Sequence, residues 1–172
     1  MEILVAELQH RTRNLLGVVR SVADRTLAGS ASLEEFGDRF RDRLGALARV
    51  NRLLSRLSEG DRITFDELLR VELAAHGVAN SSDYGGRLRL HGPRGIRLRS
   101  SMVQPLALGL HELATNALKY GALSLPEGRL SVEWQLEDRA PGEGEDAGDG
   151  DGDGERVLRV EWRESGVAVP RP

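Results

Sequence analysis

Apolar residues recur every three or four positions between residues 33 and 57, and this stripe limits the possible folds more than any other feature of the chain. Its members are Leu33, Phe36, Phe40, Leu44, Leu47, Val50, Leu54 and Leu57. Steps of three and four residues bring side chains onto one face of an α-helix, as in the seam of a helical bundle. A long amphipathic helix that ends near Gly60 is therefore predicted.

A second amphipathic stretch precedes it over residues 2–28, with Leu4, Leu8, Leu15, Val18, Val22 and Ala23 in its stripe. The segment from Gly29 to Ser32 interrupts the pattern, and Ser32 with Glu35 has the capping-box spacing that begins the next helix. Two such helices form an antiparallel hairpin that cannot enclose its own seam. We expect residues 1–60 to pair with a second copy as a four-helix bundle, although the following domain could also cover the stripe.

Residues 61–172 change to a mixed α and β pattern and are predicted to form a second domain. In chain order we expect a helix from Thr64 to about Ala79, short strands over 87–91 and 96–99, a helix over 101–121, and strands over 129–137 and 157–164. The last two strands each place apolar residues at every second position, so we expect them to pair. The predicted fold class is α+β.

Composition excludes several classes of protein. The 172 residues include no Cys, which rules out disulfides and thiolate metal sites, and no apolar run is long enough to span a membrane. The net charge is −3, and acidic residues are interspersed with Arg throughout, which argues against a nucleic-acid surface. We expect a cytoplasmic protein with no nucleic-acid partner and no membrane segment.

Residues 138–155 concentrate eight acidic residues in a stretch rich in Gly, which predicts a flexible loop. Its Asp149, Asp151 and Asp153 imitate the start of a calcium-binding loop. The twelfth position of such a loop should be Glu, but it is Val160 here, so the match fails.

His10 is a candidate nucleophile on the first helix. Glu7 and Asn14 are its neighbours at −3 and +4, and Arg11 follows it directly, while the apolar stripe runs through other positions. An exposed imidazole beside a carboxylate and guanidinium groups could attack a phosphoryl donor: Glu7 could hold its tautomer or accept a proton, and Arg11 could offset phosphate charge. An ordinary solvated histidine remains the alternative.

The helix predicted over 101–121 carries a row of polar groups. Glu112, Asn116 and Tyr120 follow one another at four-residue steps, with Lys119 adjacent. Hard oxygen ligands beside a cation suit a magnesium-bound polyphosphate, because Mg²⁺ takes few protein ligands and leaves the rest to phosphates and water. The alternative is the polar edge of a partly buried helix.

Glu164 ends the last predicted strand and is followed closely by Gly166. An acidic residue there could accept a hydrogen bond from an adenine amino group while the glycine lets the backbone pass close to the base. Trp162 alternates with core positions and is expected to pack. His76 and His91 have no evident partners and are predicted to be structural or surface residues.

Three stretches together resemble the HWE family of sensor histidine kinases, relatives of the GHKL ATPases. Residues 7–16 are similar to the H-box, residues 111–124 to the N-box, and Trp162-Arg163-Glu164 to the Trp-x-Glu motif of the family. The resemblance implies a dimerising hairpin that presents a phospho-accepting histidine, followed by a GHKL-type sandwich of helices on a mixed sheet that binds Mg-ATP.

The resemblance also implies roles for single residues, and it adds His111 as the characteristic N-box histidine. His10 would accept the γ-phosphoryl group, Asn116 would contact Mg²⁺, Lys119 would touch phosphate, Tyr120 would lie against the nucleotide, and Glu164 with Gly166 would hold the adenine edge. Glu112 would orient water or accept a proton. Asn14 matches a position that related kinases use to orient water for dephosphorylation.

The implied partner is the receiver domain of a response regulator, whose Asp would take the phosphoryl group from His10. The family continues after Glu164-Ser165-Gly166 with another Gly and a Pro, whereas Val167-Ala168-Val169 follows here. We therefore expect an ATP-binding domain that is incomplete before its glycine-rich lid and binds nucleotide weakly. A phosphotransfer module with a degenerate ATP domain is the alternative to an ATP-dependent kinase.

Overall fold

The computed structural model of the chain describes residues 2–55, 62–78, 86–138 and 156–167, and for residues 2–12 and Asn14 it describes the backbone alone. The predicted acidic loop lies outside these residues, apart from Asp138 at its start. The chain divides into two compact units, Met1–Leu57 and Ser58–Pro172. The architecture is α+β.

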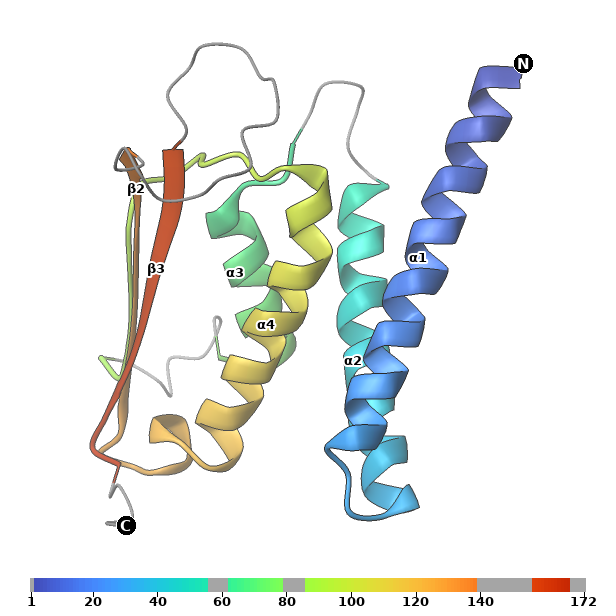
Figure 1. Ribbon diagram of the computed structural model, residues 1–172. Helices are drawn as coiled ribbons and strands as arrows, with labels where there is room; N and C mark the ends of the chain where they lie inside the picture. Colours follow the sequence, from blue (N-terminus) through green and yellow to red (C-terminus); the bar gives the residue numbers. More distant parts are fainter. Residues whose placement is uncertain (1, 56–61, 79–85, 139–155, 168–172) are drawn as a thin grey trace. The chain divides into compact units, whose positions relative to one another are not determined.

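The first unit is a helical hairpin of α1 (Glu2–Ala28) and α2 (Leu33–Leu54), which run in opposite directions (Figure 1). As predicted, Ser32 caps α2: its side chain accepts a hydrogen bond from the Glu35 N–H at 3.1 Å. The Glu35 carboxylate reaches back to the N–H of Ala31 at 2.7 Å, one residue earlier than in a standard capping box. Two hydrogen bonds therefore fix the turn that precedes α2.

Burial along the predicted stripe of α2 increases from its beginning toward its middle. Leu33 is 82% exposed, and Phe36 and Phe40 are half-buried and stack with ring centroids 5.4 Å apart. Leu47 and Val50 are fully buried. Leu33 is exposed because it is the first helical residue, next to the turn.

The second unit contains a three-stranded mixed sheet of β1 (Leu88–His91), β2 (Arg129–Asp138) and β3 (Arg156–Ser165), in the order β1-β2-β3. β1 runs parallel to β2, and β2 runs antiparallel to β3. The predicted pairing of the last two strands is confirmed, with Val132 opposite Trp162 and Trp134 opposite Val160. The apolar residues of both strands therefore share one face of the sheet.

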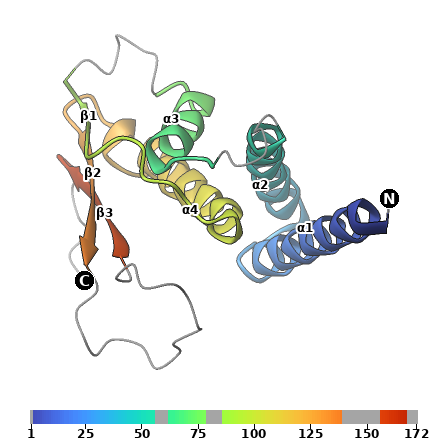
Figure 2. The same cartoon turned by 90° about the horizontal axis from the view of Figure 1, so that it is seen from above.

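Two helices, α3 (Phe65–Ala75) and α4 (Ser100–Lys119), lie against that face (Figures 1 and 2). The core contains Phe65 and Trp134, whose rings meet edge to face with centroids 5.4 Å apart. The Trp134 indole N–H donates to the carbonyl of Pro93 at 2.8 Å. A Cβ on Gly92 would come within 2.5 Å of the same indole, so only glycine lets the chain pass it.

The helix predicted to reach Ala79 ends at Ala75, because Gly77 adopts a left-handed conformation with φ +73°. The N–H of Gly77 bonds to the carbonyl of Ala74, and the N–H of Val78 bonds to the carbonyl of Leu73. This pair of bonds is a Schellman motif, the usual helix ending at a C-terminal glycine. The signal was present in the sequence as Gly77.

Two other predictions about the second unit are also wrong: one strand is missing and one helix begins earlier. Residues 96–99 do not form a strand: backbone hydrogen bonds tie Ile96 to Phe65 and Leu98 to Ile63, and an isolated bridge joins Arg97 to Thr64. These bonds fix the segment to the entry of α3 instead of to the sheet. The next helix begins at Ser100 with Arg99 as its N-cap, one residue before the predicted start.

None of the helices in the described ranges is long and apolar enough to cross a bilayer.

Candidate functional site

The predicted phosphoacceptor region lies on α1. Glu7, His10, Arg11 and Asn14 all belong to this helix, in its N-terminal half. Their side chains lie outside the described residues, so the predicted exposure of the His10 ring stays a prediction.

The predicted polar row lies on α4, at the end of this helix that leads to β2. His111 is only 6% exposed, Glu112 is half-buried, and Asn116 and Lys119 are exposed. The helix therefore presents the amide of Asn116 and the ammonium group of Lys119 to solvent within one turn of each other.

Tyr120, the last member of the predicted row, lies just past the end of α4, which was predicted to reach Gly121. The helix ends at Lys119, and Tyr120 is its C-cap with φ −131° and ψ −15°. The N–H groups of Tyr120 and Gly121 both donate to the carbonyl of Asn116, at 2.9 and 2.8 Å, which tightens the last turn. The phenol ring of Tyr120 is 73% exposed.

The end of β3 meets the end of α4 at a corner that we call the Glu164 corner, formed by Gly121, Ala122, Trp162 and Glu164. The N–H of Ala122 donates to Glu164 Oε2 at 2.7 Å, and the indole N–H of Trp162 donates to Glu164 Oε1 at 3.1 Å. Trp162 and Glu164 are two residues apart on a strand, so both project toward the helices. Stretches 42 residues apart in sequence are thereby joined.

Glycines make this corner possible. A Cβ on Gly121 would collide with Glu164 Oε2, and one on Gly128 would overlap the backbone carbonyl of Ala122. Gly166 has a left-handed φ of +77°, and a Cβ there would come within 2.9 Å of the Glu127 carbonyl oxygen. The chain that follows Glu164 therefore passes the start of β2 at a distance that side chains would not allow.

The donor set at this end of the unit suits a magnesium nucleotide in chemical type: an exposed amide oxygen, an ammonium group and a carboxylate. Each oxygen of Glu164 accepts one hydrogen bond, from Ala122 or from Trp162, and a carboxylate offers about four lone-pair positions, so it can accept another. Among the described residues, no group of three or more His, Asp or Glu side chains converges as a metal site. Mg²⁺ bound mainly by phosphates needs no such group.

Sequence reasoning missed a polar cluster between α3 and α4. Glu72 is fully buried, and its Oε2 lies 3.8 Å from Nδ1 of His111. His76, predicted to be structural or a surface residue, is half-buried and contacts the carbonyl of Glu72 and the hydroxyl of Thr115. A signal existed: Glu72 lies in the apolar stripe of α3, between Leu68, Leu69 and Leu73.

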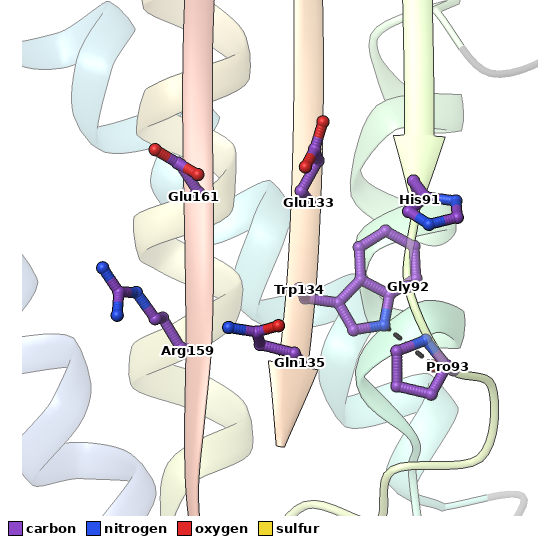
Figure 3. A pocket seen from close by; sticks show the side chains of 8 residues that line it. All are labelled: His91, Gly92, Pro93, Glu133, Trp134, Gln135, Arg159 and Glu161. Atoms are coloured by element: carbon purple, nitrogen blue, oxygen red, sulfur yellow. Dashed lines mark hydrogen bonds between the residues drawn. The ribbon is translucent and has the colours of Figure 1, made fainter. Parts of the chain in front are cut away.

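A hollow of about 500 Å³ opens on the face of the sheet that points away from α3 and α4 (Figure 3). It is lined by His91, Gly92, Pro93, Glu133, Trp134, Gln135, Arg159 and Glu161. No residue that the sequence singled out for phosphate or nucleotide chemistry lines it. The hollow and the Glu164 corner are therefore separate features on opposite faces, and the corner is the one that carries the predicted motifs.

Comparison with known proteins gives a consistent picture. A family model described as "HWE histidine kinase" matches residues 7–94, about half of the chain. "Blue-light-activated histidine kinase 1" of Erythrobacter litoralis is 36% identical over 137 residues, which cover 78% of this chain and 36% of that protein. The "Blue-light-activated histidine kinase" of Brucella anthropi is 32% identical over 171 residues, 99% of this chain and 31% of the relative. The chain spans about a third of the length of these curated relatives.

Proposed function

The chain belongs to the HWE histidine kinase family, and from this premise we propose that it is the phosphoacceptor and nucleotide-binding part of an ATP-dependent protein histidine kinase. The observation that carries the proposal is the Glu164 corner. There Glu164 of the Trp-x-Glu motif accepts a hydrogen bond from the N–H of Ala122, three residues after the end of the N-box helix α4.

The nucleotide is proposed to bind at this end of the second unit, between the Glu164 corner and the exposed side of α4. Glu164 accepts a hydrogen bond from the adenine amino group. Gly166 lets the backbone pass close to the base, and Tyr120 lies against the nucleotide. Lys119 contacts phosphate oxygens, and Asn116 contributes its amide oxygen to Mg²⁺. When bound, Mg²⁺ neutralises phosphate charge.

The proposed reaction transfers the γ-phosphoryl group of ATP to His10. An unprotonated ring nitrogen attacks the γ-phosphorus, the bond from this phosphorus to the β–γ bridging oxygen breaks, and ADP leaves. Glu7 holds the tautomer or accepts the ring proton, and Arg11 offsets the charge of the new phosphoryl group. Glu112 orients water or accepts a proton beside the phosphates. Positioning and charge neutralisation supply most of the acceleration in such transfers.

The N–P bond formed is labile, so we propose that the phosphoryl group passes to an Asp in the receiver domain of a response regulator. Asn14 would orient a water molecule for the reverse, dephosphorylating activity. A homodimer that completes a four-helix bundle with two α1–α2 hairpins is proposed as the acting form.

The test is to incubate the chain with γ-labelled ATP and Mg²⁺ and to follow the label. We expect acid-labile, base-stable label that is lost in His10→Gln and kept in His91→Gln, a matched control because His91 is an exposed histidine on the outer face of the sheet. Asn116→Asp should reduce Mg-ATP affinity at least about 10-fold, because a second anion near the phosphates opposes binding.

Two outcomes would contradict the kinase proposal. If phosphorylated receiver domain labels His10 but ATP does not, the chain is a phosphotransfer module. If Asn116→Asp leaves Mg-ATP affinity unchanged, the nucleotide site is assigned to the wrong residues.

A further inference from the structure

The interface between α3 and α4 contains a carboxylate with no access to solvent. Glu72 is 0% exposed, and its Oε2 lies 3.8 Å from Nδ1 of His111, which is itself buried on α4. Figure 2 shows these two helices side by side, next to the sheet. A buried carboxylate is costly unless its surroundings compensate it, and the imidazole of His111 is a nearby group that can do so.

A second polar contact lies one helical turn farther along α3. The His76 ring contacts the Glu72 carbonyl through Nδ1 at 2.8 Å and the Thr115 hydroxyl through Nε2 at 3.1 Å. The rings of His76 and His111 also lie against each other, with centroids 4.8 Å apart and an interplanar angle of 42°. Glu72 on α3 and His76, the C-cap of α3, thus contact two residues four apart on α4, His111 and Thr115.

These four residues, Glu72, His76, His111 and Thr115, form what we call the α3–α4 clamp. On α4 they are the immediate predecessors of the candidate site residues: His111 precedes Glu112, and Thr115 precedes Asn116. Successive residues project about 100° apart around a helix. Fixing the direction of His111 and Thr115 therefore fixes the direction in which Glu112 and Asn116 project.

The other buried residues of α4 are apolar. They are Val103, Ala107, Leu110, Ala114 and Ala117. Apolar burial is non-directional, whereas hydrogen bonds and charge contacts depend on geometry. A rotation of α4 by roughly 10° would move a side-chain group 5–6 Å from its axis by about 1 Å. A shift of that size can reduce a reaction rate by about 10²-fold.

We propose that Glu72 is a positioning residue that acts through His111: the α3–α4 clamp sets the rotation of α4 and so aims Glu112 and Asn116 at the magnesium-bound phosphates. This inference rests on the proposed function, because it assigns the clamp to that site. It also gives the N-box histidine a physical role, as the buried end of the clamp and not as a group that touches substrate.

The experiment compares Glu72→Gln with Glu67→Gln in the full chain. Both remove one carboxylate from α3, but Glu67 only caps the start of its own helix, by accepting hydrogen bonds from Thr64. We expect Glu72→Gln to slow labelling of His10 by about 10- to 100-fold, with weaker Mg-ATP binding and a circular dichroism spectrum like that of the parent chain. Glu67→Gln should stay within about twofold of the parent chain in the rate of His10 labelling and in Mg-ATP affinity, even if the variant has a lower unfolding midpoint.

A double-variant measurement separates positioning from general damage. If Glu72 acts through His111, then Glu72→Gln combined with His111→Gln should slow labelling no more than the more severe single variant does. If the fold-losses in labelling rate of the two single variants multiply in the double variant, the inference is overturned. A folded Glu72→Gln chain with the parent affinity and rate would also overturn it. If Glu72→Gln fails to fold, Thr115→Val serves as the test instead, because it removes the hydroxyl that contacts His76 while the side chain keeps nearly the same shape. A rate of His10 labelling in Thr115→Val equal to that of the parent chain would then overturn the inference.

The inference and the proposed function can fail separately. A parent chain that neither binds Mg-ATP nor acquires label contradicts the proposed function. The position of Asn116 is then read from the NMR resonances of its side-chain amide. A shift in Glu72→Gln that is absent in Glu67→Gln supports the clamp, and unchanged resonances in both overturn it.

Discussion

The two faces of the sheet consist of alternate residues of the same strands, yet they hold their side chains very differently. On the helix-facing side, Leu130 and Val132 are at most 1% exposed, and Glu164 bonds to the backbone of another element. On the outer side, Glu161 pairs with Arg163, two residues along its own strand, and both side chains are about half exposed or more.

This difference teaches that the parity of a position along β2 and β3 decides what the position can do. The spacing of the Trp-x-Glu motif places Trp162 and Glu164 on the helix-facing side, where a partner element stands within hydrogen-bonding distance. Shifted by one residue, the same side chains would lie on the outer face, among exposed ion pairs. The following predictions test this contrast.

The largest effect is expected where the helix-facing layer is tightest. Gly128→Ala would place a Cβ onto the carbonyl of Ala122, and backbone atoms at this distance cannot move aside as a flexible side chain would. We expect the free energy of unfolding to fall by about 3 kcal/mol, at the upper end of overpacking effects. Denaturant unfolding of the full chain measures it.

Gly95→Ala is the matched control for this substitution. Gly95 has a left-handed φ of +80°, which Gly128 does not, but no atom lies within 4 Å of its would-be Cβ. It should therefore cost only about 1 kcal/mol, from backbone conformation alone. Equal losses in the two variants would mean that the corner is not packed as described.

The contrast between the two faces was predictable from the sequence, because period-two alternation in residues 129–137 and 157–164 identifies the buried side. The exact partners were not predictable. Periodicity indicates which face of an element is buried but not which residue of another element meets it. The contact of Glu164 with Ala122 spans 42 residues, and that of His76 with Thr115 spans 39.

The α3–α4 clamp is a second set of contacts between elements that periodicity could not identify. Glu112 and Asn116 could be predicted as candidates because polar residues at helical spacing suggest chemistry, whereas Glu72 is one of several charged residues in its helix. Its place between Leu69 and Leu73 was the available signal. The end of α4 was predicted two residues too late, at Gly121, because the four-residue step from Asn116 to Tyr120 was taken to continue the helix, whereas Tyr120 is its C-cap.

A smaller effect is expected from a carboxylate at the start of α3. Burial raises the pKa of Asp66, but hydrogen bonds from the Gly95 N–H, the Thr64 hydroxyl and its own backbone, together with Arg70, outweigh it and hold the pKa below its ordinary value of 3.8. A lowered folded pKa contributes stability that is present above the unfolded pKa and is lost as the pH falls through the folded pKa.

Asp66→Asn should therefore be less stable than the parent chain near neutral pH, and this difference should shrink as the pH falls from about 5 through the unfolded and then the folded pKa of Asp66. Urea unfolding at a series of pH values measures it. Asp24→Asn, which changes an exposed aspartate on α1, is the comparison. A stability difference for Asp66→Asn that is constant across this range would show that the interactions of the carboxylate are not charge-dependent.

The smallest effect is expected on the outer face, and it is best measured as a pair on one strand. Glu161→Ala removes an ion pair with Arg163 whose side chains are 47% and 66% exposed, so we expect a loss below about 0.5 kcal/mol. Glu164→Ala removes the acceptor of the Ala122 N–H and of the Trp162 indole, and should cost about 1 kcal/mol. The two residues are three positions apart and chemically identical, so only the face differs. Equal losses, or a larger loss at Glu161, would contradict the claim that the helix-facing side alone holds its polar groups in place, and the Glu164 corner would then have no more structural definition than the exposed surface.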